Sequence, residues 1–427
     1  MTNITVVAMG KIGLPLAVQF ASMGHKVIGT DINKETVELI NSGIEPFPGE
    51  FNLQEKLMKV VSSGDLVATA DTTSAVAQSD VVVIVVPLFV DTWGVPDFGW
   101  MDNATISVAK GLKKGTLVSY ETTLPVGTTR NRFSKMLEGE SGLTAGVDFY
   151  LAFSPERVFT GRVFEDLRKY PKLVGGINDV SGQKAKEFYE SVLEFDDRQD
   201  LPKKNGVWDL GSSEAGELAK LAETTYRDVN IGLANQFAQF ASKNEIDIYK
   251  VIEACNSQPY SHIHQPGIAV GGHCIPIYPR MYLWNDPSAS IVKIAREVNL
   301  GMPKFTVDLL EEKHGDLKGQ IVVVLGATYR GGVKETAFSG IFSVVEQLQS
   351  KGAVVRVHDP MFSDVELKDF NLSPFSLGES ADAVILQSNH SEYLNVSEKD
   401  FKGIRTMIDG RNFTSSTQFK NVGWYSI

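Results

Sequence analysis

A strand, a glycine-containing turn, a helix and a second strand follow one another at the start of the chain. The β-branched run ITVVAM (residues 4–9) predicts the first strand, LPLAVQFASMGHK (14–26) the helix, and VIGTD (27–31) the second strand. Two strands joined through a helix run parallel, and a parallel sheet needs cover on both of its faces. The opening of the chain therefore predicts a doubly wound α/β fold.

Further strand-like runs continue this pattern. They occur at residues 67–69, 80–86 and 115–121, separated by stretches that could hold helices. The first domain is predicted to extend to about Phe195. The polar segment DDRQDLPKKNGVWDLG (196–211) is rich in turn-forming residues, so it is predicted to be a loop or a domain boundary.

A long helix is predicted after this boundary. Apolar residues recur there at spacings of three or four, and no proline interrupts residues 212–243. The predicted stripe consists of Leu218, Leu221, Thr225, Val229, Leu233, Phe237 and Phe240. We expect this helix to bridge two domains, and it is a candidate dimer interface.

A second α/β pattern occupies the C-terminal part of the chain. The strand IVVVLG (321–326) opens it, and strands follow at residues 354–358, 383–387 and 406–408. The predicted fold class is α/β, with two Rossmann-like doubly wound domains joined by a long central helix. The predicted domains are 1–200, 201–300 and 301–427.

Composition and charge exclude several classes of protein. A chain of 427 residues exceeds the roughly 250–300 residues that one core supports. Its net charge of -11 repels polyanions, so nucleic acid is not an expected partner. The longest apolar run, residues 81–90, is broken by Pro87 and is shorter than the roughly 18 residues of a membrane span. Membrane insertion is therefore not expected.

The cysteines and the N-terminal residues indicate a compartment. Cys255 and Cys274 are too few for a disulfide scaffold, and they lack the spacing of a zinc site. The N-terminal stretch has no basic region followed by a cleavage site of small residues. We expect a reducing cytoplasm and no bound metal.

The turn AMGKIGLPLA carries most of a GxGxxG fingerprint. Gly10 and Gly13 occupy its second and third glycine positions, and Ala8 replaces the first. The second glycine lets backbone amides approach a pyrophosphate, and the helix N-terminus adds a partial positive charge. Asp31 ends the second strand, where a carboxylate accepts the ribose 2′-hydroxyl of NAD and repels the 2′-phosphate of NADP. The turn predicts NAD binding; alternatively, the glycines serve only helix packing.

Two residues outside this turn are candidate reactive groups. In VGGHCIPIYP, Gly271 and Gly272 stand beside Cys274, which favours presentation of the thiol over its burial as a small apolar residue. Lys220 falls on or near the apolar stripe of the long helix. Its ammonium group either lines a site or extends along the stripe to solvent.

Two segments, ETTLPVGTTR and FSPERVFTGR, each follow a predicted strand. Ligands of open α/β sheets lie outside the carboxyl ends of the strands, so Thr123 and Glu156 are predicted to face a ligand. An alternative is that Thr128 or Thr129 caps a helix and that Pro155 forms a plain turn.

Six motifs taken together carry a resemblance to a known family. In chain order they are GKIGLPLA, ETTLPVGTTR, SPERV, ELAKLAETTYRDVNI, GGHCIP and IDGRN. Over essentially its whole length the chain resembles the UDP-glucose/GDP-mannose dehydrogenase family. The segments GRVFEDLRKYPKLVGG and RDVNI are most similar to members that oxidise UDP-N-acetylhexosamines. The resemblance implies a nucleotide-sugar substrate, a role in polysaccharide biosynthesis and a homodimer or higher homo-oligomer.

The resemblance also implies a mechanism. The family oxidises C6 of a sugar by four electrons in two NAD-dependent steps, through a thiohemiacetal and a thioester on a cysteine. Cys274 matches the nucleophile, and Lys220 matches the lysine that stabilises the developing oxyanion. Thr123 and Glu156 match residues that hold water and contact cofactor or substrate.

Binding residues follow from the same match. Those implied for the cofactor are Gly10, Lys11, Ile12, Gly13, Asp31, Pro87, Thr123 and Glu156. Those implied for the substrate are Glu156, Arg157, Val158, Lys220, Gly271, Gly272 and Arg330. The second α/β unit has no GxGxxG after IVVVLG, so it is predicted to hold the nucleotide sugar and not a second NAD.

Several residues depart from the family pattern. Thr224 stands where an asparagine is common, and Tyr278 where an aspartate is common, yet both are expected in the catalytic network. A tyrosine cannot act as a carboxylate base near neutral pH. These departures are therefore expected to affect the hydrolysis of the thioester. Arg330 replaces a lysine, while Ala337 and Tyr260 each replace an arginine. The identity of the sugar and of the base therefore stays open.

Alternatives within and outside the family remain. The substrate would be UDP-N-acetylglucosamine, UDP-glucose or GDP-mannose in the nearest alternatives. A two-electron dehydrogenase of the β-hydroxyacid type would use Lys220 for acid–base work, with Cys274 only packing. A non-catalytic nucleotide-sugar binding protein would explain Thr224, Tyr278 and Ala337. The number of NADH molecules formed per sugar separates these classes.

Overall fold

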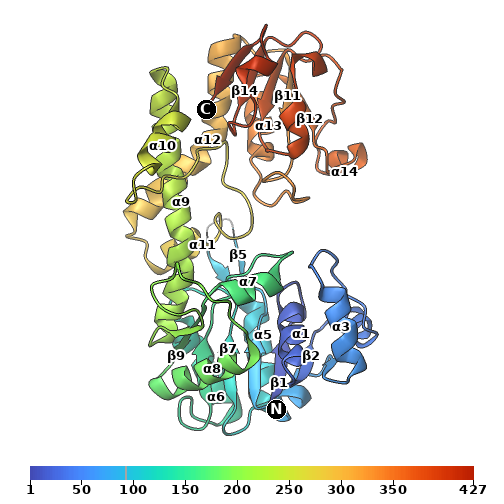
Figure 1. Cartoon of the computed structure of the whole chain (residues 1–427), viewed down its shortest axis with the longest axis vertical. Helices are drawn as coiled ribbons and strands as arrows, with labels where there is room; N and C mark the ends of the chain where they lie inside the picture. The colour runs from blue at the N-terminus through green and yellow to red at the C-terminus, as the bar shows by residue number, and fades with distance from the viewer. Residues whose placement is uncertain (92–93) are drawn as a thin grey trace. The chain divides into compact units, whose positions relative to one another are not determined.

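The chain folds into two compact α/β units. A computed structural model describes residues 1–91 and 94–427. The first unit comprises residues 1–222 and the second comprises residues 223–427. Helix α9 (Ser213–Lys243) begins in the first unit and ends in the second (Figure 1). The predicted α/β class and the predicted long helix are both confirmed.

The first unit is built on an eight-stranded sheet in the order β10-β9-β8-β7-β4-β1-β2-β3. Neighbouring strands are parallel except β8 and β9, which are antiparallel. The strands are β1 (Asn3–Val7), β2 (Lys26–Thr30), β3 (Leu66–Thr69), β4 (Val81–Ile84), β7 (Leu117–Tyr120), β8 (Tyr150–Phe153), β9 (Lys172–Gly176) and β10 (Val207–Asp209). A separate antiparallel pair comprises β5 (Phe89–Val90) and β6 (Pro96–Asp97).

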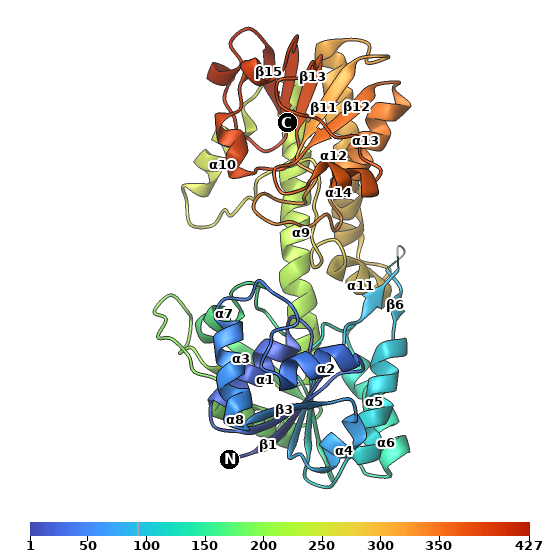
Figure 2. The same cartoon turned by 90° about the vertical axis from the view of Figure 1, so that its right-hand side faces the viewer.

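Helices cover both faces of this sheet, with α1, α3 and α8 on one side and α4, α5 and α6 on the other (Figure 2). Side chains alternate along a strand, so Val81 and Val83 of β4 join one core while Val82 and Ile84 join the other. The helical segments are α1 (Gly13–Ser22), α2 (Lys34–Asn41), α3 (Leu53–Ser62), α4 (Thr72–Ala77), α5 (Gly99–Gly111), a π-helical turn (Thr129–Phe133), α6 (Ser134–Ser141), α7 (Val163–Lys169) and α8 (Asp179–Val192).

The segment 196–211 is not only the loop that its composition predicts. It contains β10, which pairs with β9 and extends the first sheet. A three-residue edge strand owes its conformation to pairing with its neighbour, and it carries no apolar run of its own. The first compact unit therefore continues past this segment into α9.

The second unit contains a five-stranded parallel sheet in the order β12-β11-β13-β14-β15. Helices α12 and α13 pack on one face, and loops with short 3-10 turns cover the other. Its strands are β11 (Ile321–Leu325), β12 (Val354–His358), β13 (Ala383–Leu386), β14 (Thr406–Asp409) and β15 (Gly423–Ser426). Its helices after α9 are α10 (Ile248–Asn256), α11 (Tyr278–Asn285), α12 (Ser290–His314), α13 (Ile341–Ser350) and α14 (Asp364–Asp369), with 3-10 turns at Ser391–Asn395, Glu398–Asp400 and Ser416–Gln418.

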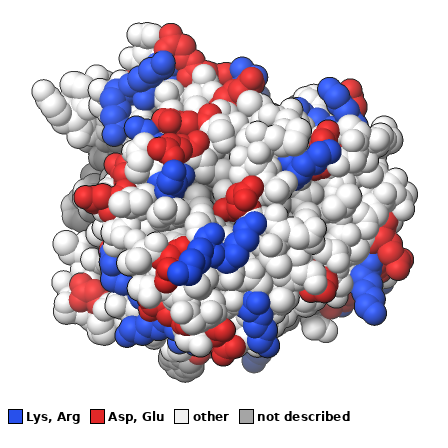
Figure 3. All heavy atoms as spheres, turned by 90° about the horizontal axis from the view of Figure 1, so that it is seen from below, with Lys and Arg blue, Asp and Glu red and all other residues white. Residues whose placement is uncertain are grey.

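Surface charge and helix character complete the description. On the face drawn in Figure 3, lysine and arginine side chains are interspersed with aspartate and glutamate side chains. Among the described residues, no helix is both long enough and apolar enough to cross a membrane.

Candidate functional site

The carboxyl ends of parallel strands gather many of the predicted site residues at one edge of the first sheet. β1 lies between β4 and β2, so the strand order reverses at β1 and β4, where open α/β sheets bind ligands. The segments that follow five neighbouring strands carry Gly10 after β1, Asp31 after β2, Pro87 after β4, Thr123 after β7 and Glu156 after β8.

The turn after β1 has the geometry of a phosphate cradle. A Cβ atom added at Gly13 would lie 1.9 Å from the carbonyl oxygen of Ala8, so only glycine lets α1 start this close to the strand. At Gly10, by contrast, no described atom lies within 4 Å of that position, which leaves space for a ligand. Ala8 adopts a φ of 75°, a left-handed conformation that favours glycine.

Asp31 is fixed at the end of β2. One carboxylate oxygen accepts the backbone N–H of Met9, and the other accepts that of Asn33, each at 2.9 Å. Each carboxylate oxygen has a second lone pair for a ribose hydroxyl. Lys11 is exposed, and with Gly10 it lines a small cavity of about 40 Å³. These residues fit NAD, whose pyrophosphate would lie at the glycine turn and whose adenosine ribose would lie at Asp31.

A buried charged cluster lies beside this edge. The Lys172 ammonium donates to Glu121 at 2.6 Å and to Glu156 at 2.9 Å, and Tyr189 donates to Glu121 at 2.6 Å. The side chains of Lys172, Glu121 and Glu156 are 4%, 0% and 12% exposed. Sequence reasoning missed Lys172 and Glu121; the available signal was a lysine at the start of the otherwise apolar strand KLVGG.

Two carboxylates share one ammonium group in this cluster, so the environment separates their pKa values. Burial raises the pKa of Glu121 to about 7, against the opposing effect of Lys172. Burial opposes ionisation of Glu156 too, but Lys172 and the backbone N–H of Arg157 outweigh it and lower the pKa of Glu156. The folded state therefore holds a proton on Glu121 more tightly than the unfolded chain does. That stabilisation is lost as the pH rises from about 4.5 to about 7.

Glu156 also organises the SPERV loop. Its Oε1 accepts the backbone N–H groups of Arg157 at 2.6 Å and Val158 at 3.2 Å. Its backbone carbonyl accepts a hydrogen bond from the Lys220 ammonium at 2.6 Å. The first unit thus brings Lys220, on α9, to the loop after β8.

A second buried carboxylate attaches α9 to the segment that contains Thr123. Glu217 accepts the N–H groups of Gly127 at 2.5 Å and Thr129 at 2.8 Å, and the Thr129 hydroxyl at 2.7 Å. The Thr128 hydroxyl donates to Pro125, and the π-helical turn after it has no side-chain cap. The alternative that Thr128 or Thr129 serves as a helix cap is therefore wrong, because both hydroxyls are used elsewhere.

The second unit presents Cys274 at the surface. Cys274 is exposed, so the alternative of a buried packing residue is wrong. A Cβ atom added at Gly271 would lie 2.5 Å from Cβ of Tyr329, and Gly272 has a φ of 91°. The two glycines thus allow the loop to lie directly against the segment after β11. The Cys274 carbonyl then accepts the N–H of Tyr278 at 2.9 Å, which starts α11.

The remaining predicted residues divide between the units. Arg157, Val158, Ile12 and Pro87 belong to the first unit, as does Lys220. The second unit contains Thr224, Gly271, Gly272, Cys274, Tyr278 and Arg330. Arg330 is exposed, whereas Thr224 is completely buried on α9.

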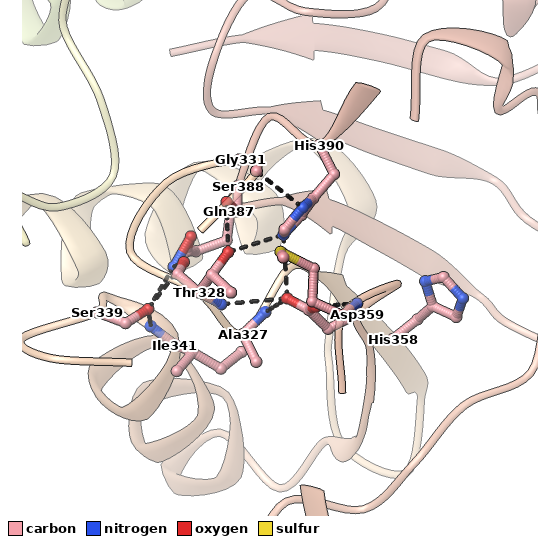
Figure 4. A network of polar contacts seen from close by, with 12 residues as sticks. Ala327, Thr328, Gly331, Ser339, Ile341, His358, Asp359, Gln387, Ser388 and His390 are labelled. Carbon is pink, nitrogen blue, oxygen red and sulfur yellow. Dashed lines mark hydrogen bonds and ion pairs between the residues drawn. The ribbon is translucent and has the colours of Figure 1, made fainter. Parts of the chain in front are cut away.

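Asp359 occupies in the second unit the position that Asp31 occupies in the first, but its contacts differ. It follows β12 as Asp31 follows β2, but its Oδ2 accepts the N–H groups of Ala327 at 2.7 Å and Thr328 at 3.1 Å, and it pairs with His390 at 3.1 Å (Figure 4). Burial opposes ionisation, yet these contacts lower the pKa of Asp359. This carboxylate is only 4% exposed and is occupied within the unit.

Comparison with known proteins agrees with this geometry. Three domain models of the UDP-glucose/GDP-mannose dehydrogenase family match the chain: the NAD binding domain at residues 2–193, the central domain at 214–300 and the UDP binding domain at 323–416. The chain belongs to this family, as its motifs indicated. It is an NAD-dependent nucleotide-sugar dehydrogenase, and the predicted cofactor is confirmed.

Individual relatives cover nearly the whole chain. UDP-N-acetyl-D-mannosamine dehydrogenase of Pyrococcus horikoshii is 36% identical over 96% of this chain and 95% of its own length. A solved structure of the UDP-D-ManNAc dehydrogenase from that organism has a TM-score of 0.85 at 33% identity, covering 99% of this chain and 98% of its own. The NDP-N-acetyl-D-galactosaminuronic acid dehydrogenase of Methanosarcina mazei has a TM-score of 0.86 at 28% identity, covering 100% and 95%.

Proposed function

We propose that this dehydrogenase oxidises C6 of UDP-N-acetyl-D-mannosamine to the uronic acid, through covalent intermediates on Cys274, for polysaccharide biosynthesis. The observation that carries the mechanism is the exposed thiol on a loop packed against the segment after β11. The choice of sugar rests on the near full-length relatives that bear this name.

The residues of the chain supply the chemistry around the hydride transfers, and bound NAD supplies the hydride acceptor. Loss of the first hydride and the hydroxyl proton turns the C6 alcohol into an aldehyde. Cys274 Sγ then forms a C–S bond to C6, and the thiol proton passes to the aldehyde oxygen, which gives a thiohemiacetal. Loss of the second hydride from C6 leaves a thioester. Water then breaks the C–S bond, which releases the carboxylate and returns the thiol.

We assign residues of the first unit to stabilise the developing negative charge and to position water. We assign the Lys220 ammonium to the oxygen that becomes negative, since a fixed cation stabilises such charge most strongly where water is excluded. Lys220 is already oriented by its bond to the Glu156 carbonyl. Glu156 and Thr123 are assigned to water and substrate. Tyr278 and Thr224 stand in for an aspartate and an asparagine, so hydrolysis proceeds without a carboxylate base at position 278.

The count of NADH molecules per limiting sugar tests this function. With UDP-N-acetyl-D-mannosamine and excess NAD, we expect two NADH and one equivalent of an acidic product, measured by absorbance and by mass spectrometry. One NADH per sugar would contradict the covalent four-electron route. Faster turnover of UDP-N-acetylglucosamine, an N-acetylgalactosamine nucleotide, UDP-glucose or GDP-mannose would reassign the substrate.

We also propose that the enzyme is a homodimer or a higher homo-oligomer. Leu233, Phe237 and Phe240 of α9 are 47%, 41% and 65% exposed, an apolar surface that a second copy would cover. Light scattering at micromolar concentration should give at least twice the 46.8 kDa chain mass, and Phe240→Asp should shift the enzyme toward monomer. A wild-type monomer would contradict this assignment. The proposed compartment is the cytoplasm, where a catalytic thiol stays reduced.

A further inference from the structure

A cavity of about 140 Å³ lies within the second unit, beside the loop that carries Cys274. Its walls include Ala269, Val270 and Pro276 from that loop, together with residues of α12 and of the start of α13. One water molecule in the liquid occupies roughly 30 Å³, so the cavity has room for a polyatomic ligand.

Two arginines line this cavity. They are Arg280 of α11 and Arg296 of α12, and the lining residues include no aspartate or glutamate among those that the structure describes. Arg296 is only 5% exposed. One of its terminal nitrogens donates to Asp228 at 2.6 Å, but its Nε has no hydrogen-bond partner among the described residues. A buried donor without a partner is unfavourable, so Arg296 keeps unsatisfied hydrogen-bonding capacity beside the cavity.

The charges at Arg296 favour an anion. Burial lowers the pKa of Arg296, the carboxylate of Asp228 opposes this, and the like charge of Arg280 lowers it further. The Asp228 Oδ1 also accepts the Asn299 amide at 2.8 Å, whereas its Oδ2 has no hydrogen-bond partner among the described residues. The two arginines that line the cavity thus outnumber the one carboxylate that pairs with Arg296.

The start of α13 adds to this potential. The helix begins at Ile341, whose N–H donates to the Ser339 hydroxyl at 3.3 Å, and its N-cap, Gly340, makes no side-chain cap. Ser339, Gly340 and Ser343 all line the cavity. The N-terminus of a ten-residue helix carries a partial positive charge that favours bound anions.

We propose that this cavity is a binding site for a small oxyanion, held by Arg296, Arg280 and the first turn of α13. The site is separate from the residues assigned above to NAD, to the nucleotide sugar and to catalysis. Because Ala269, Val270 and Pro276 form one of its walls, a bound anion restrains the loop that presents Cys274. This last consequence rests on the proposed function, whereas anion binding does not.

Titration of the full-length enzyme with inorganic phosphate tests the site. The unfolding midpoint is measured at constant ionic strength, with chloride replacing phosphate, so that general salt effects cancel. We expect a saturable rise of the midpoint for wild type and at least about tenfold weaker binding for Arg280→Gln. Lys293→Gln removes one exposed positive charge of α12 outside the cavity lining and should change affinity less than about twofold.

Arg280 is the informative position because loss of Arg296 would leave Asp228 buried without its partner and would endanger folding. The proposal would be overturned if Arg280→Gln and Lys293→Gln weakened phosphate binding equally. It would also be overturned if the unfolding midpoint of the wild-type enzyme did not change with phosphate. Displacement of phosphate by saturating UDP would also overturn it, since the anion would then occupy the nucleotide site. None of these readouts uses NADH formation, so failure here is distinct from failure of the proposed reaction.

Discussion

Replacing Cys274 with serine should lower kcat for UDP-N-acetyl-D-mannosamine by at least about 10³-fold. A serine hydroxyl is a far weaker nucleophile than a thiolate, and removal of a covalent nucleophile typically costs several orders of magnitude. Steady-state NADH production measures the loss, and titration with NAD should show unchanged cofactor binding, because the residues assigned to NAD lie in the other compact unit.

The chain offers a matched control for this substitution. Cys255 of α10 is partly exposed and is the other free cysteine, so Cys255→Ser should leave kcat within about twofold. Retention of wild-type kcat by Cys274→Ser would exclude a thiol adduct. Equal losses in both variants would point to a structural effect of the substitutions.

Replacing Lys172 with methionine should lower the free energy of unfolding by about 3–5 kcal/mol. The substitution leaves Glu121 and Glu156 buried and close together without the ammonium that both contact. Removal of one partner of a buried ion pair typically costs this much, since an uncompensated charge remains. The shift of the urea unfolding transition measures the loss.

The pH dependence distinguishes this cause from a packing defect. Without Lys172 the pKa of Glu121 rises further above the ordinary 4.5, and the pKa of Glu156, which Lys172 lowers in the native protein, rises as well. The penalty should therefore be largest above pH 7 and should shrink as the pH falls toward 4.5, where protons neutralise the cluster. Lys114→Met removes an exposed lysine that pairs with Asp148 and should cost less than about 1 kcal/mol. A pH-independent loss in Lys172→Met would contradict the electrostatic account.

Long-range contacts decide which side of α9 is buried. The sequence predicts the helix correctly, but its apolar stripe is only partly the buried face. Leu221 and Thr225 of the stripe are buried, whereas Leu233, Phe237 and Phe240 are exposed. Asp228 and Asn235, outside the stripe, are completely buried. Asn299 contacts both of these polar residues, and Arg296 pairs with Asp228. Polar residues with such partners can be buried, and periodicity alone does not reveal partners 64 to 71 positions away.

The sequence by itself determined the strand–helix alternation of both units, the long helix, the glycine turn with Asp31, and the family to which the chain belongs. These features depend on local periodicity, on turn chemistry and on motif order, which are all readable along the chain. The tertiary structure alone decided how Lys172 links Glu121 and Glu156, how Glu217 anchors the turn at Gly127, and how Arg296 faces a cavity. These contacts join residues from 16 to 90 positions apart, and only folding brings such residues together and buries them where their charges matter.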